Sequence, residues 1–517
     1  MAVFFKRPKP VVLAIMDGVG VAPPGEGNAV TLADTPNLDR LWPNYPHTYL
    51  EASGLNVGLP QGTDGNSEVG HMTLGAGKVI FQNLPRIDNA IVNGSFFENP
   101  LLKSAFSHAK KNNGTVHLMG LVGTGFVHAS VEHLYALIKM AGEEKMKSDR
   151  VAIHVFTDGR DSPPDAAIDC IEKIEAVCIQ RRVGKLASIV GRAYSMDRNR
   201  NWARTKIAYD MLVNSKANRV KDWKKAIKES YDKKVTDEYI DPIMIDYDGE
   251  VYKVEDGDSI IFFNFRPDRA VQLTMAFEDS EFKEFETTKY KDLYYVGMTD
   301  YENGYPHNKA FPLEKVSSPM GKILSDHGLK QLRLAESEKF PHVTYFFNGA
   351  NKDIYPLETW LEVPSPKDVA TYDKKPEMSQ KWVTDVLVEK LKTDEYDFML
   401  INYAGPDMVA HTGIIGATKI AMETCDECIG RLIQEVLKKD GAVIITSDHG
   451  NAEELIDLKT GNPDTKHSTN QVPVVIVKNG LQGRELTVGG LSDIAPTILR
   501  LMGLEIPPEM TGRDLLA

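Results

Sequence analysis

Short apolar runs rich in β-branched residues alternate with longer stretches of helical spacing along almost the whole chain. This alternation is typical of βαβ units, in which parallel strands are joined by helices that cover the sheet. The expected strands are Val11–Met16, Val116–Leu121, Ala152–Phe156, Leu186–Val190, Ile260–Asn264, Tyr294–Met298, Phe398–Asn402, Val443–Thr446 and Val472–Val477. So many strands exceed what one sheet usually holds. The pattern therefore predicts an α/β protein with two domains, each a mostly parallel sheet flanked by helices.

The residues that follow the expected strands divide them into two groups. Strands near both ends of the chain run into aspartate and histidine, as in VVLAIMDG, MLINYAGPDMVAHTG and AVIITSDHGNAE. Strands in the middle run into arginine, as in HVFTDGRDSPP, SIVGRAYSMDRNR and IIFFNFRPDRA. Ligands of parallel α/β sheets bind at the carboxyl ends of strands, so both groups stand where sites are expected. We predict a metal-type domain of residues 1–80 and 315–517, with an arginine-lined domain of residues 81–314 inserted, and linkers near Lys78–Ile87 and Asn308–Ser318.

Composition and charge exclude several classes of protein. The chain has 517 residues, 60 of them basic and 73 acidic, and its formal net charge of −13 argues against nucleic acid or an anionic membrane as partner. The first apolar run ends at Asp17, which is typical of a strand and not of a signal peptide. No window approaches the roughly 20 apolar residues of a membrane-spanning helix. We therefore expect a cytoplasmic protein.

Two short motifs suggest chemistry that their surroundings do not support. The glycines in GVGVAPPGEG lack the spacing of a dinucleotide-binding turn, and Pro24 prevents a normal helix start for pyrophosphate. Cys425 and Cys428 form a C-x-x-C pair, which can indicate redox or zinc chemistry. Helical spacing of the surrounding apolar residues places Cys425 on a buried face, so we interpret these cysteines as structural.

Aspartate and histidine residues in four segments form a candidate metal site. Asp17 ends a buried strand, where an unpaired carboxylate is costly unless it meets a cation, a hydrogen-bond network or a helix end. Asp407 and His411 would share one face if their segment is helical. Each residue alone could instead fill a turn, cap or packing role. A mixed carboxylate and imidazole set suits Mn, Zn, Co or Mg. The candidates are Asp17, Asp407, His411, Asp448, His449 and His467.

A serine in TDGNSEVGHM stands where a turn leads into an expected helix. Ser67 could simply cap that helix, or it could be an activated nucleophile. A hydroxyl is a poor nucleophile at neutral pH, but a bound divalent cation lowers the pKa of the oxygen beside it. The two interpretations are compatible, because the unpaired N–H groups of a helix start also favour a phosphate.

Arginines that follow the middle strands form a candidate anion site. Guanidinium groups grip a carboxylate or phosphate at two points and so fix its orientation. They could equally form structural ion pairs with nearby carboxylates such as Asp197 and Asp268. The residues alone leave both interpretations open. The arginines are Arg160, Arg192, Arg198, Arg266 and Arg269.

Six motifs together indicate a family. The segments MDGVG, GNSEVGHMTLGAG, DGRDSPP, NFRPDRA, NYAGPDMVAHTG and TSDHGNAE closely resemble motifs of the cofactor-independent (2,3-bisphosphoglycerate-independent) phosphoglycerate mutases of the alkaline phosphatase superfamily. The matches run in the expected order from Asp17 to His467. The resemblance implies a discontinuous alkaline-phosphatase-like domain with two divalent metal ions and an inserted transferase domain. It further implies a monomeric, cytoplasmic isomerase of glycolysis and gluconeogenesis that uses manganese, or else magnesium or cobalt, and needs no 2,3-bisphosphoglycerate.

The resemblance also implies roles for individual residues. One metal ion would be held by Asp407, His411 and His467, and the other by Asp17, Ser67, Asp448 and His449. Ser67 would take the phosphoryl group from 3-phosphoglycerate, and the 2-hydroxyl of the retained glycerate would then attack the phosphoserine to give 2-phosphoglycerate. Lys339 would offset negative charge, Asp161 would accept the hydroxyl proton, and domain closure would exclude water. The small-molecule substrate would meet His128, Arg160, Asp161, Arg192, Arg198, Arg266, Arg269 and Lys339.

One segment departs from the family pattern, and three rival functions stay open. Gly123–Ser130 reads GTGFVHAS, where the family commonly has a run like SDGGVHSH. His128 is kept, but Thr124, Phe126 and Ser130 replace an aspartate, a glycine and a histidine, so we expect altered substrate geometry and unchanged metal ligands. The rivals are a metal-dependent phosphatase or phosphodiesterase, a phosphopentomutase, and a non-catalytic protein that binds a phosphorylated ligand.

Overall fold

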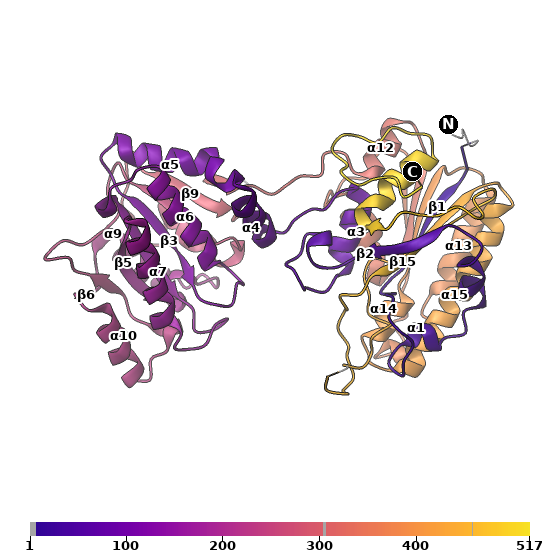
Figure 1. Cartoon of the computed structure of the whole chain (residues 1–517), viewed down its shortest axis with the longest axis horizontal. Helices are drawn as coiled ribbons and strands as arrows, with labels where there is room; N and C mark the ends of the chain where they lie inside the picture. The colour runs from indigo at the N-terminus through magenta and orange to yellow at the C-terminus, as the bar shows by residue number, and fades with distance from the viewer. Residues whose placement is uncertain (1–6, 303–306, 458, 517) are drawn as a thin grey trace. The chain divides into compact units, whose positions relative to one another are not determined.

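The computed structural model of the chain describes residues 7–302, 307–457 and 459–516, which form two compact units (Figure 1). Unit 1 comprises Met1–Gln82 and Glu314–Ala517, and unit 2 comprises Asn83–Leu313. Unit 1 is therefore discontinuous in sequence, and unit 2 is inserted into it. Each unit has its own sheet and its own apolar core.

The sheet of unit 1 has parallel strands at its centre. Its strands are β1 (Val11–Met16), β2 (His47–Glu51), β11 (Gln331–Glu336), β12 (Glu358–Val363), β13 (Phe398–Tyr403), β14 (Ala442–Thr446), β15 (Val472–Lys478) and β16 (Gly489–Gly490). They lie in the order β12-β11-β13-β1-β14-β15-β2-β16. Antiparallel pairs join β14 to β15 and β15 to β2, whereas β1 is parallel to both its neighbours.

Helices cover both faces of this sheet. The odd-numbered residues of β1 enter one core together with α3, α12 and α16, and the even-numbered residues enter a second core together with α13 and α15. Side chains alternate along a strand, so a continuous apolar run is what a strand covered on both faces requires. Cys425 and Cys428 lie in the second core as free thiols, as expected for structural cysteines. The helices are α1 (Ala29–Leu32), α2 (Pro36–Leu41), α3 (Ser67–Ala76), α12 (Met320–Asp326), α13 (Gln380–Lys392), α14 (Gly405–Ala410), α15 (Ile415–Leu437) and α16 (Ile494–Leu501).

Unit 2 has a second sheet of the same kind. Its strands are β3 (Val116–Val122), β4 (Val151–Thr157), β5 (Lys185–Gly191), β6 (Asn218–Val220), β7 (Ile243–Ile245), β8 (Ser259–Phe262), β9 (Tyr294–Thr299) and β10 (Asn308–Phe311), in the order β10-β9-β8-β3-β4-β5-β7-β6. The pair of β5 and β7 is antiparallel, and the other neighbours are parallel. The helices are α4 (Asn83–Asn93), α5 (Pro100–Lys111), α6 (Val131–Glu143), α7 (Ala167–Arg181), α8 (Arg192–Ser195), α9 (Trp202–Asn214), α10 (Trp223–Asp232) and α11 (Val271–Glu278). The predicted α/β class with mostly parallel sheets is confirmed. Among the described residues, no helix has both the length and the apolar character to cross a membrane.

All the expected strands are present, but the apolar pattern missed others. Residues 263 and 264 lie beyond the end of β8: Phe263 N still donates to the Met119 carbonyl oxygen at 3.0 Å, but Leu121 N donates to the side-chain Oδ1 of Asn264 at 2.9 Å. The missed strands include β11, whose buried Arg333 pairs with Glu358 of β12 at 2.9 Å. A charged pair inside a sheet interrupts the apolar run by which a buried strand is recognised.

Candidate active site

The carboxyl ends of the central strands of unit 1 carry acidic side chains. β1 is parallel to and in register with β13 and β14, so the three strands end at the same edge of the sheet. Asp17 follows β1, Asp407 lies on α14 just after β13, and Asp448 follows β14. Segments far apart in sequence therefore converge at this edge, as the strand pattern predicts.

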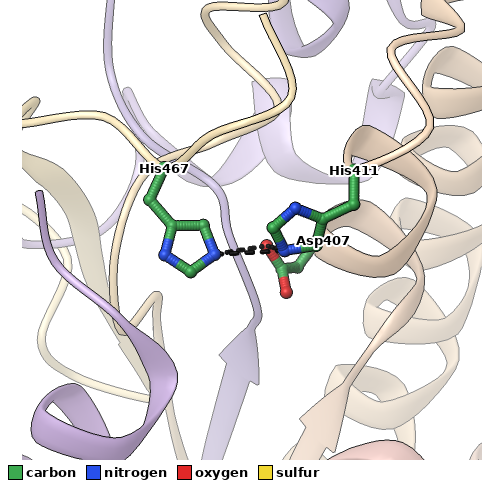
Figure 2. A group of neighbouring side chains, drawn as sticks. All are labelled: Asp407, His411 and His467. Carbon is green, nitrogen blue, oxygen red and sulfur yellow. Dashed lines mark hydrogen bonds and ion pairs between the residues drawn. The ribbon is translucent and has the colours of Figure 1, made fainter.

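Asp407, His411 and His467 form one compact group, and Figure 2 shows the two rings turned toward the carboxylate. His411 Nε2 and His467 Nε2 lie 3.4 and 3.5 Å from Asp407 Oδ1 and 3.1 Å from each other. Their Nδ1 atoms face the carbonyl oxygens of Thr465 and Gly65 at 2.9 and 2.8 Å. A carbonyl oxygen only accepts hydrogen bonds, so in the neutral rings Nδ1 carries the proton and Nε2 keeps its lone pair. Three donor atoms therefore converge in the way that a divalent ion requires.

Asp17, Ser67, Asp448 and His449 form a second group, which shares Asp407 with the first through a cluster of Asp17, Asp407 and His449. Ser67 Oγ lies 2.9 Å from His449 Nε2 and 3.4 Å from Asp17 Oδ1. His449 Nε2 lies 3.5 Å from Asp17 Oδ1 and 3.6 Å from Asp448 Oδ2. The structure thus brings together all seven residues that the resemblance assigns to metal.

Ser67 is the first residue of α3 and not its cap. Asn66 holds the N-cap position, and its side chain accepts a hydrogen bond from Val69 N at 3.1 Å. The interpretation of Ser67 as a plain N-cap is therefore wrong, because the neighbouring amide takes that role and leaves the hydroxyl to the side chains around it. A glycine allows α3 to approach the loop after β14, since a Cβ on Gly70 would lie 2.6 Å from the carbonyl oxygen of Asp448.

Lys339 bridges the two groups. It ends a 3-10 helix, Ser337–Lys339, that follows β11. Its buried Nζ donates hydrogen bonds to Asp17 Oδ1 and Ser67 Oγ, both at 2.7 Å, and to Asp407 Oδ2 at 2.6 Å. Burial disfavours the ammonium, but the carboxylates of Asp17 and Asp407 outweigh it and raise the pKa of Lys339. The side chain therefore places a permanent positive charge beside the serine hydroxyl.

The buried carboxylates outnumber this one cation. Burial, and then the charge of Asp448, raise the pKa of Asp17, so its charged form lacks sufficient positive charge nearby. One ammonium cannot balance the carboxylates of Asp17, Asp407 and Asp448, whereas divalent cations can. Oxygen and imidazole donors suit Mn, Co, Zn or Mg. The residues present fit divalent metal binding.

Further side chains hold the ligands in place although the sequence pattern does not single them out. Asn451 Nδ2 donates to Asp407 Oδ1 at 2.7 Å, and Asn402 Nδ2 donates to Asp17 Oδ2 at 2.6 Å. His71 Nε2 lies 3.1 Å from the same amide of Asn402. Such partners orient metal ligands and tune their basicity. The available signal was their place within or beside the motifs that carry the ligands.

In unit 2, Arg192 is the buried centre of the arginine set. It begins α8 at the carboxyl end of β5, and its Nη1 contacts Asp158 Oδ1 at 2.5 Å and Asp161 Oδ2 at 2.6 Å. Asp158 also accepts hydrogen bonds from the backbone N–H groups of Arg160 and Asp161 and from Ser162 Oγ. Asp158 therefore shapes the DGRDSPP loop, a role that the sequence pattern missed.

Asp268 joins three of the predicted contact residues. It accepts hydrogen bonds from Arg198 Nη1 at 2.9 Å and Arg266 Nε at 3.1 Å, and it lies 3.4 Å from His128 Nδ1. Burial, and then the charge of Arg192, lower the pKa of His128 to about 4, so the ring is neutral at neutral pH. The side chains of Arg198 and Arg266 are 45 and 46% exposed, which leaves their guanidinium groups accessible to a ligand.

Ion pairs with nearby carboxylates are present in the arginine set: Arg192 contacts Asp158 and Asp161, Arg198 and Arg266 contact Asp268, and Arg160 lies 3.8 Å from Glu238. Asp268 does pair with two of them, but Asp197 Oδ1 instead accepts hydrogen bonds from the backbone N–H groups of Asn199 and Asn201 and from Gln272 Nε2. These bonds use Asp197 to shape the loop before α9 and not to neutralise a guanidinium.

Arg160 and Arg269 complete the set. Arg269 Nη1 donates to the Met196 carbonyl oxygen at 3.0 Å, and the side chain of Arg160 is half exposed. Burial, followed by the charges of Arg192, Arg198 and Arg160, lowers the pKa of Arg269. Like charges held together in this way indicate a site for an anion.

Asp161 contacts both Arg192 and His128. Its Oδ2 lies 2.6 Å from Arg192 Nη1 and 3.7 Å from His128 Nε2. Partial burial raises the pKa of Asp161, but the hydrogen bond and charge of Arg192 outweigh this and lower it. The carboxylate is therefore ionised and can accept a proton, though as a weak base while Arg192 holds it.

The altered segment Gly123–Ser130 keeps His128 tied to the arginine loop. The His128 carbonyl oxygen accepts hydrogen bonds from Phe265 N at 2.9 Å and Arg266 N at 3.2 Å. Phe126 is 47% exposed and has a φ of 51°, a left-handed conformation that glycine adopts more readily. The expected departure thus lies in unit 2, as do the predicted substrate contacts other than Lys339, and the predicted metal ligands lie in unit 1.

Comparisons with known families and sequences agree over nearly the whole chain. Residues 87–303 match the family model of the BPG-independent PGAM N-terminus, and residues 324–472 match that of type I phosphodiesterase / nucleotide pyrophosphatase. The chain is 48% identical over 510 residues to the 2,3-bisphosphoglycerate-independent phosphoglycerate mutase of Clostridium beijerinckii, covering 98% of this chain and 99% of the relative. The enzyme of the same name from Moorella thermoacetica is 46% identical, with 98% of each chain covered.

A solved structure shows the same likeness. The crystal structure of Leishmania mexicana phosphoglycerate mutase at low cobalt concentration is 33% identical in sequence. The aligned region covers 99% of this chain and 98% of the Leishmania mexicana chain, with a TM-score of 0.54.

Proposed function

Because the chain belongs to the 2,3-bisphosphoglycerate-independent phosphoglycerate mutases, a family of isomerases, we propose that it interconverts 3-phosphoglycerate and 2-phosphoglycerate through a phosphoserine on Ser67. The observation that carries the phosphoserine is the position of Ser67 Oγ, 2.7 Å from Lys339 Nζ and 2.9 Å from His449 Nε2. When bound, divalent ions supply positive charge that lowers the pKa of a neighbouring hydroxyl. Asp17, Ser67, Asp448 and His449 would hold one ion, and Asp407, His411 and His467 the other.

The first half-reaction moves the phosphoryl group to the serine. Ser67 Oγ loses its proton and attacks phosphorus, the bond from phosphorus to the 3-oxygen of the substrate breaks, and the 3-oxygen takes up a proton, so glycerate is left with a free 3-hydroxyl. Lys339 stabilises negative charge on the transferring group, because its ammonium already contacts Ser67 Oγ. The free N–H groups at the start of α3 favour the resulting phosphoserine by about 0.3–1 kcal/mol.

The second half-reaction returns the group to the neighbouring carbon. Asp161 accepts the proton of the 2-hydroxyl, the hydroxyl oxygen attacks phosphorus, and the bond to Ser67 Oγ breaks, after which Ser67 Oγ takes up a proton and is a hydroxyl again. Arg192 would give up part of its contact with Asp161 when it grips the substrate, and this exchange restores the basicity of Asp161. Arg160, Arg198, Arg266, Arg269 and His128 would hold the carboxylate and keep glycerate from leaving.

Several finer expectations stay predictions. Manganese is the expected ion, with magnesium or cobalt as alternatives, and the donor set accommodates all three. A monomer in the cytoplasm, acting without nucleic acid, is expected on the resemblance. 2,3-Bisphosphoglycerate should be unnecessary, because the phosphoryl group is carried by the protein itself.

An enolase-coupled assay tests this function. Metal-loaded protein should convert 3-phosphoglycerate without added 2,3-bisphosphoglycerate, and a chelator should abolish the conversion. Ser67→Ala should remove both turnover and the covalent phosphoryl group seen by intact mass, whereas Ser95→Ala, at an exposed serine of unit 2, should change neither. Release of free phosphate without 2-phosphoglycerate would identify a phosphatase instead, and binding without conversion would identify a non-catalytic protein.

A further inference from the structure

Glu453 is a buried side chain that receives hydrogen bonds from separate loops of unit 1. Gly20 N and Asn451 N donate to its Oε2 at 2.9 and 2.8 Å. Ser468 Oγ and Asn470 Nδ2 donate to its Oε1, the latter at 3.0 Å. All four donors are neutral groups, and the side chain is only 2% exposed. One carboxylate therefore ties the loop after β1 to two separate stretches of the loop that joins β14 to β15.

Each of these loops carries a predicted metal ligand close to its contact with Glu453. The neighbouring pairs are Asp17 and Gly20, His449 and Asn451, and His467 and Ser468. Asn451 makes a further connection, because its backbone N–H binds Glu453 while its Nδ2 donates to Asp407 Oδ1 at 2.7 Å. Displacing this carboxylate would therefore change the spacing of ligands in both metal groups at once.

Two glycines leave the space that the carboxylate fills. A Cβ on Gly20 would lie 2.3 Å from Glu453 Oε1, and a Cβ on Gly450 would lie 2.3 Å from the same atom. Both distances are far inside van der Waals contact, so the backbone closes tightly on the carboxylate. The Glu453 carboxylate is therefore closely packed, unlike a flexible carboxylate at the protein surface.

We propose that Glu453 is a positioning residue that sets the geometry of the metal ligands in unit 1, an inference that rests on the proposed function of that group. Partners that orient metal ligands without touching the ion typically change metal affinity by about 10–100-fold. Among the described residues, Glu453 forms no hydrogen bond with a ligand side chain; it binds the backbone of the loops that carry the ligands. Its loss should therefore weaken metal binding more than it weakens the fold.

The donors around Glu453 distinguish its possible replacements. In Glu453→Gln the new NH₂ group can face Ser468 Oγ, because a hydroxyl can rotate to accept, while Asn470 Nδ2 keeps its hydrogen bond to Glu454. The remaining oxygen then still accepts from the backbone N–H groups of Gly20 and Asn451. Glu453→Ala offers no acceptor to any of the four donors. We therefore expect glutamine to restore most of what alanine removes.

Calorimetric titration of Mn²⁺ into the metal-free full-length protein tests the proposal. Glu453→Ala should bind about 10–100-fold more weakly than the parent, and Glu453→Gln less than about 10-fold more weakly. The matched control is Glu454→Ala, because Glu454 is partly buried and accepts from the same amide of Asn470 at 2.9 Å. It should bind Mn²⁺ as the parent does.

A second pair of variants keeps the test decisive if Glu453→Ala fails to fold. Gly20→Ala pushes a methyl group into the Glu453 carboxylate, whereas a Cβ on Gly25 meets nothing within 4 Å. Gly20→Ala should weaken Mn²⁺ binding by a similar factor, and Gly25→Ala should not.

Two readouts separate the outcomes. A merely structural role would lower the metal-free melting temperature and leave Mn²⁺ affinity unchanged, and that result would overturn the proposal. Because the titration needs no turnover, weaker binding in the Glu453 variants supports the positioning role even if the parent fails to interconvert phosphoglycerates. Parental Mn²⁺ affinity in both Glu453→Ala and Gly20→Ala, with normal turnover in the parent, would sink the inference and leave the proposed function intact.

Discussion

The two charged groups of this chain are built in opposite ways. In unit 1 the acidic side chains are buried, and the His411 and His467 rings are fixed by backbone carbonyl oxygens. In unit 2 guanidinium groups pair with carboxylates at the protein surface, and those of Arg198 and Arg266 are about half exposed. The first group is therefore a preformed set of donors that lacks positive charge, and the second is an adaptable set of cations.

This difference matches the demands of the two kinds of ligand. A small divalent ion needs several donor atoms at fixed short distances, and only a framework of strands and hydrogen bonds can hold them there. A phosphoglycerate is larger and must be gripped, turned over and released, which long side chains with exchangeable partners allow. Asp268 suits this role, because its ion pairs with Arg198 and Arg266 are partly exposed and could open to an arriving anion.

The largest effect is expected when one of the predicted metal ligands of unit 1 is removed. Asp407→Asn deletes the charge that His411, His467 and Lys339 share. We expect a loss of activity of at least about 10³-fold and a matching loss of Mn²⁺ affinity, because a neutral amide binds divalent ions poorly. Coupled assays and calorimetry measure both, and Asp385→Asn, in a surface pair with Arg431, should be neutral. A variant with full activity and weak metal binding would contradict the link between them.

Lowering the pH should affect ligand binding by the metal group and by the arginine group differently. The hydrogen bond to Asp407 raises the pKa of His411, and the same carboxylate overcomes burial to raise that of His467. In the metal-free protein a raised histidine pKa adds stability below the unfolded value of 6.5, and this is lost as the pH rises through the folded value. Metal must displace these protons, so Mn²⁺ affinity should fall with decreasing pH by up to about 100-fold per unit when both rings are protonated.

The arginine group should not share this dependence. Guanidinium groups keep their charge throughout the range, and the neutral His128 ring gains a proton only near its pKa of about 4. Sulfate, whose own charge is constant there, should bind metal-free protein with little change between about pH 8 and pH 6. Titrations of Mn²⁺ and of sulfate across this pH range measure both affinities. If both affinities fell in parallel, the predicted difference between the two groups would be contradicted.

Within the arginine group, substitution of a buried arginine should reduce activity more than substitution of an exposed one. Arg192→Lys replaces a buried guanidinium, whose Nη1 contacts both Asp158 and Asp161, with an ammonium, and we expect kcat/KM to fall about 100-fold. Arg198→Lys, at a half-exposed pair, should cost about 10-fold and act mainly on KM. Neither change should alter Mn²⁺ affinity. Steady-state kinetics with metal titration measure this, and equal effects of the two variants would show that burial is not what ranks them.

Much of the fold follows from sequence because the central strands are continuous apolar runs. β11 escapes this pattern, since Arg333 and Glu336 are buried in it and Arg333 is neutralised by a partner on β12. Pairing of that kind depends on contacts between distant segments, which local periodicity does not contain.

The site divides in the same way. The strand pattern locates Asp17 and Asp448 at one sheet edge, and the family resemblance adds Lys339, which no spacing rule would have found. Asn402 and Glu453 were missed, because residues that act through hydrogen bonds leave no periodic signature. Ser67 was placed correctly, but the cap belongs to Asn66, and which of two adjacent polar residues takes the cap depends on the dihedral angles of the turn.

The smallest predicted effect concerns Gly123–Ser130, the segment that we expect to depart from the family pattern. Phe126 holds a φ of 51° while its ring is largely exposed, so it has the strain of a left-handed backbone with little packing in return. Phe126→Gly should relieve about 1 kcal/mol of strain, partly offset by the greater freedom of glycine in the unfolded chain, for a net rise in unfolding free energy below about 1 kcal/mol.

Asn113→Gly is the matched control, because Asn113 has the same φ of 51° and asparagine tolerates this conformation. Denaturant unfolding should therefore show a larger gain at Phe126, and a loss there would mean that the ring makes a stabilising contact.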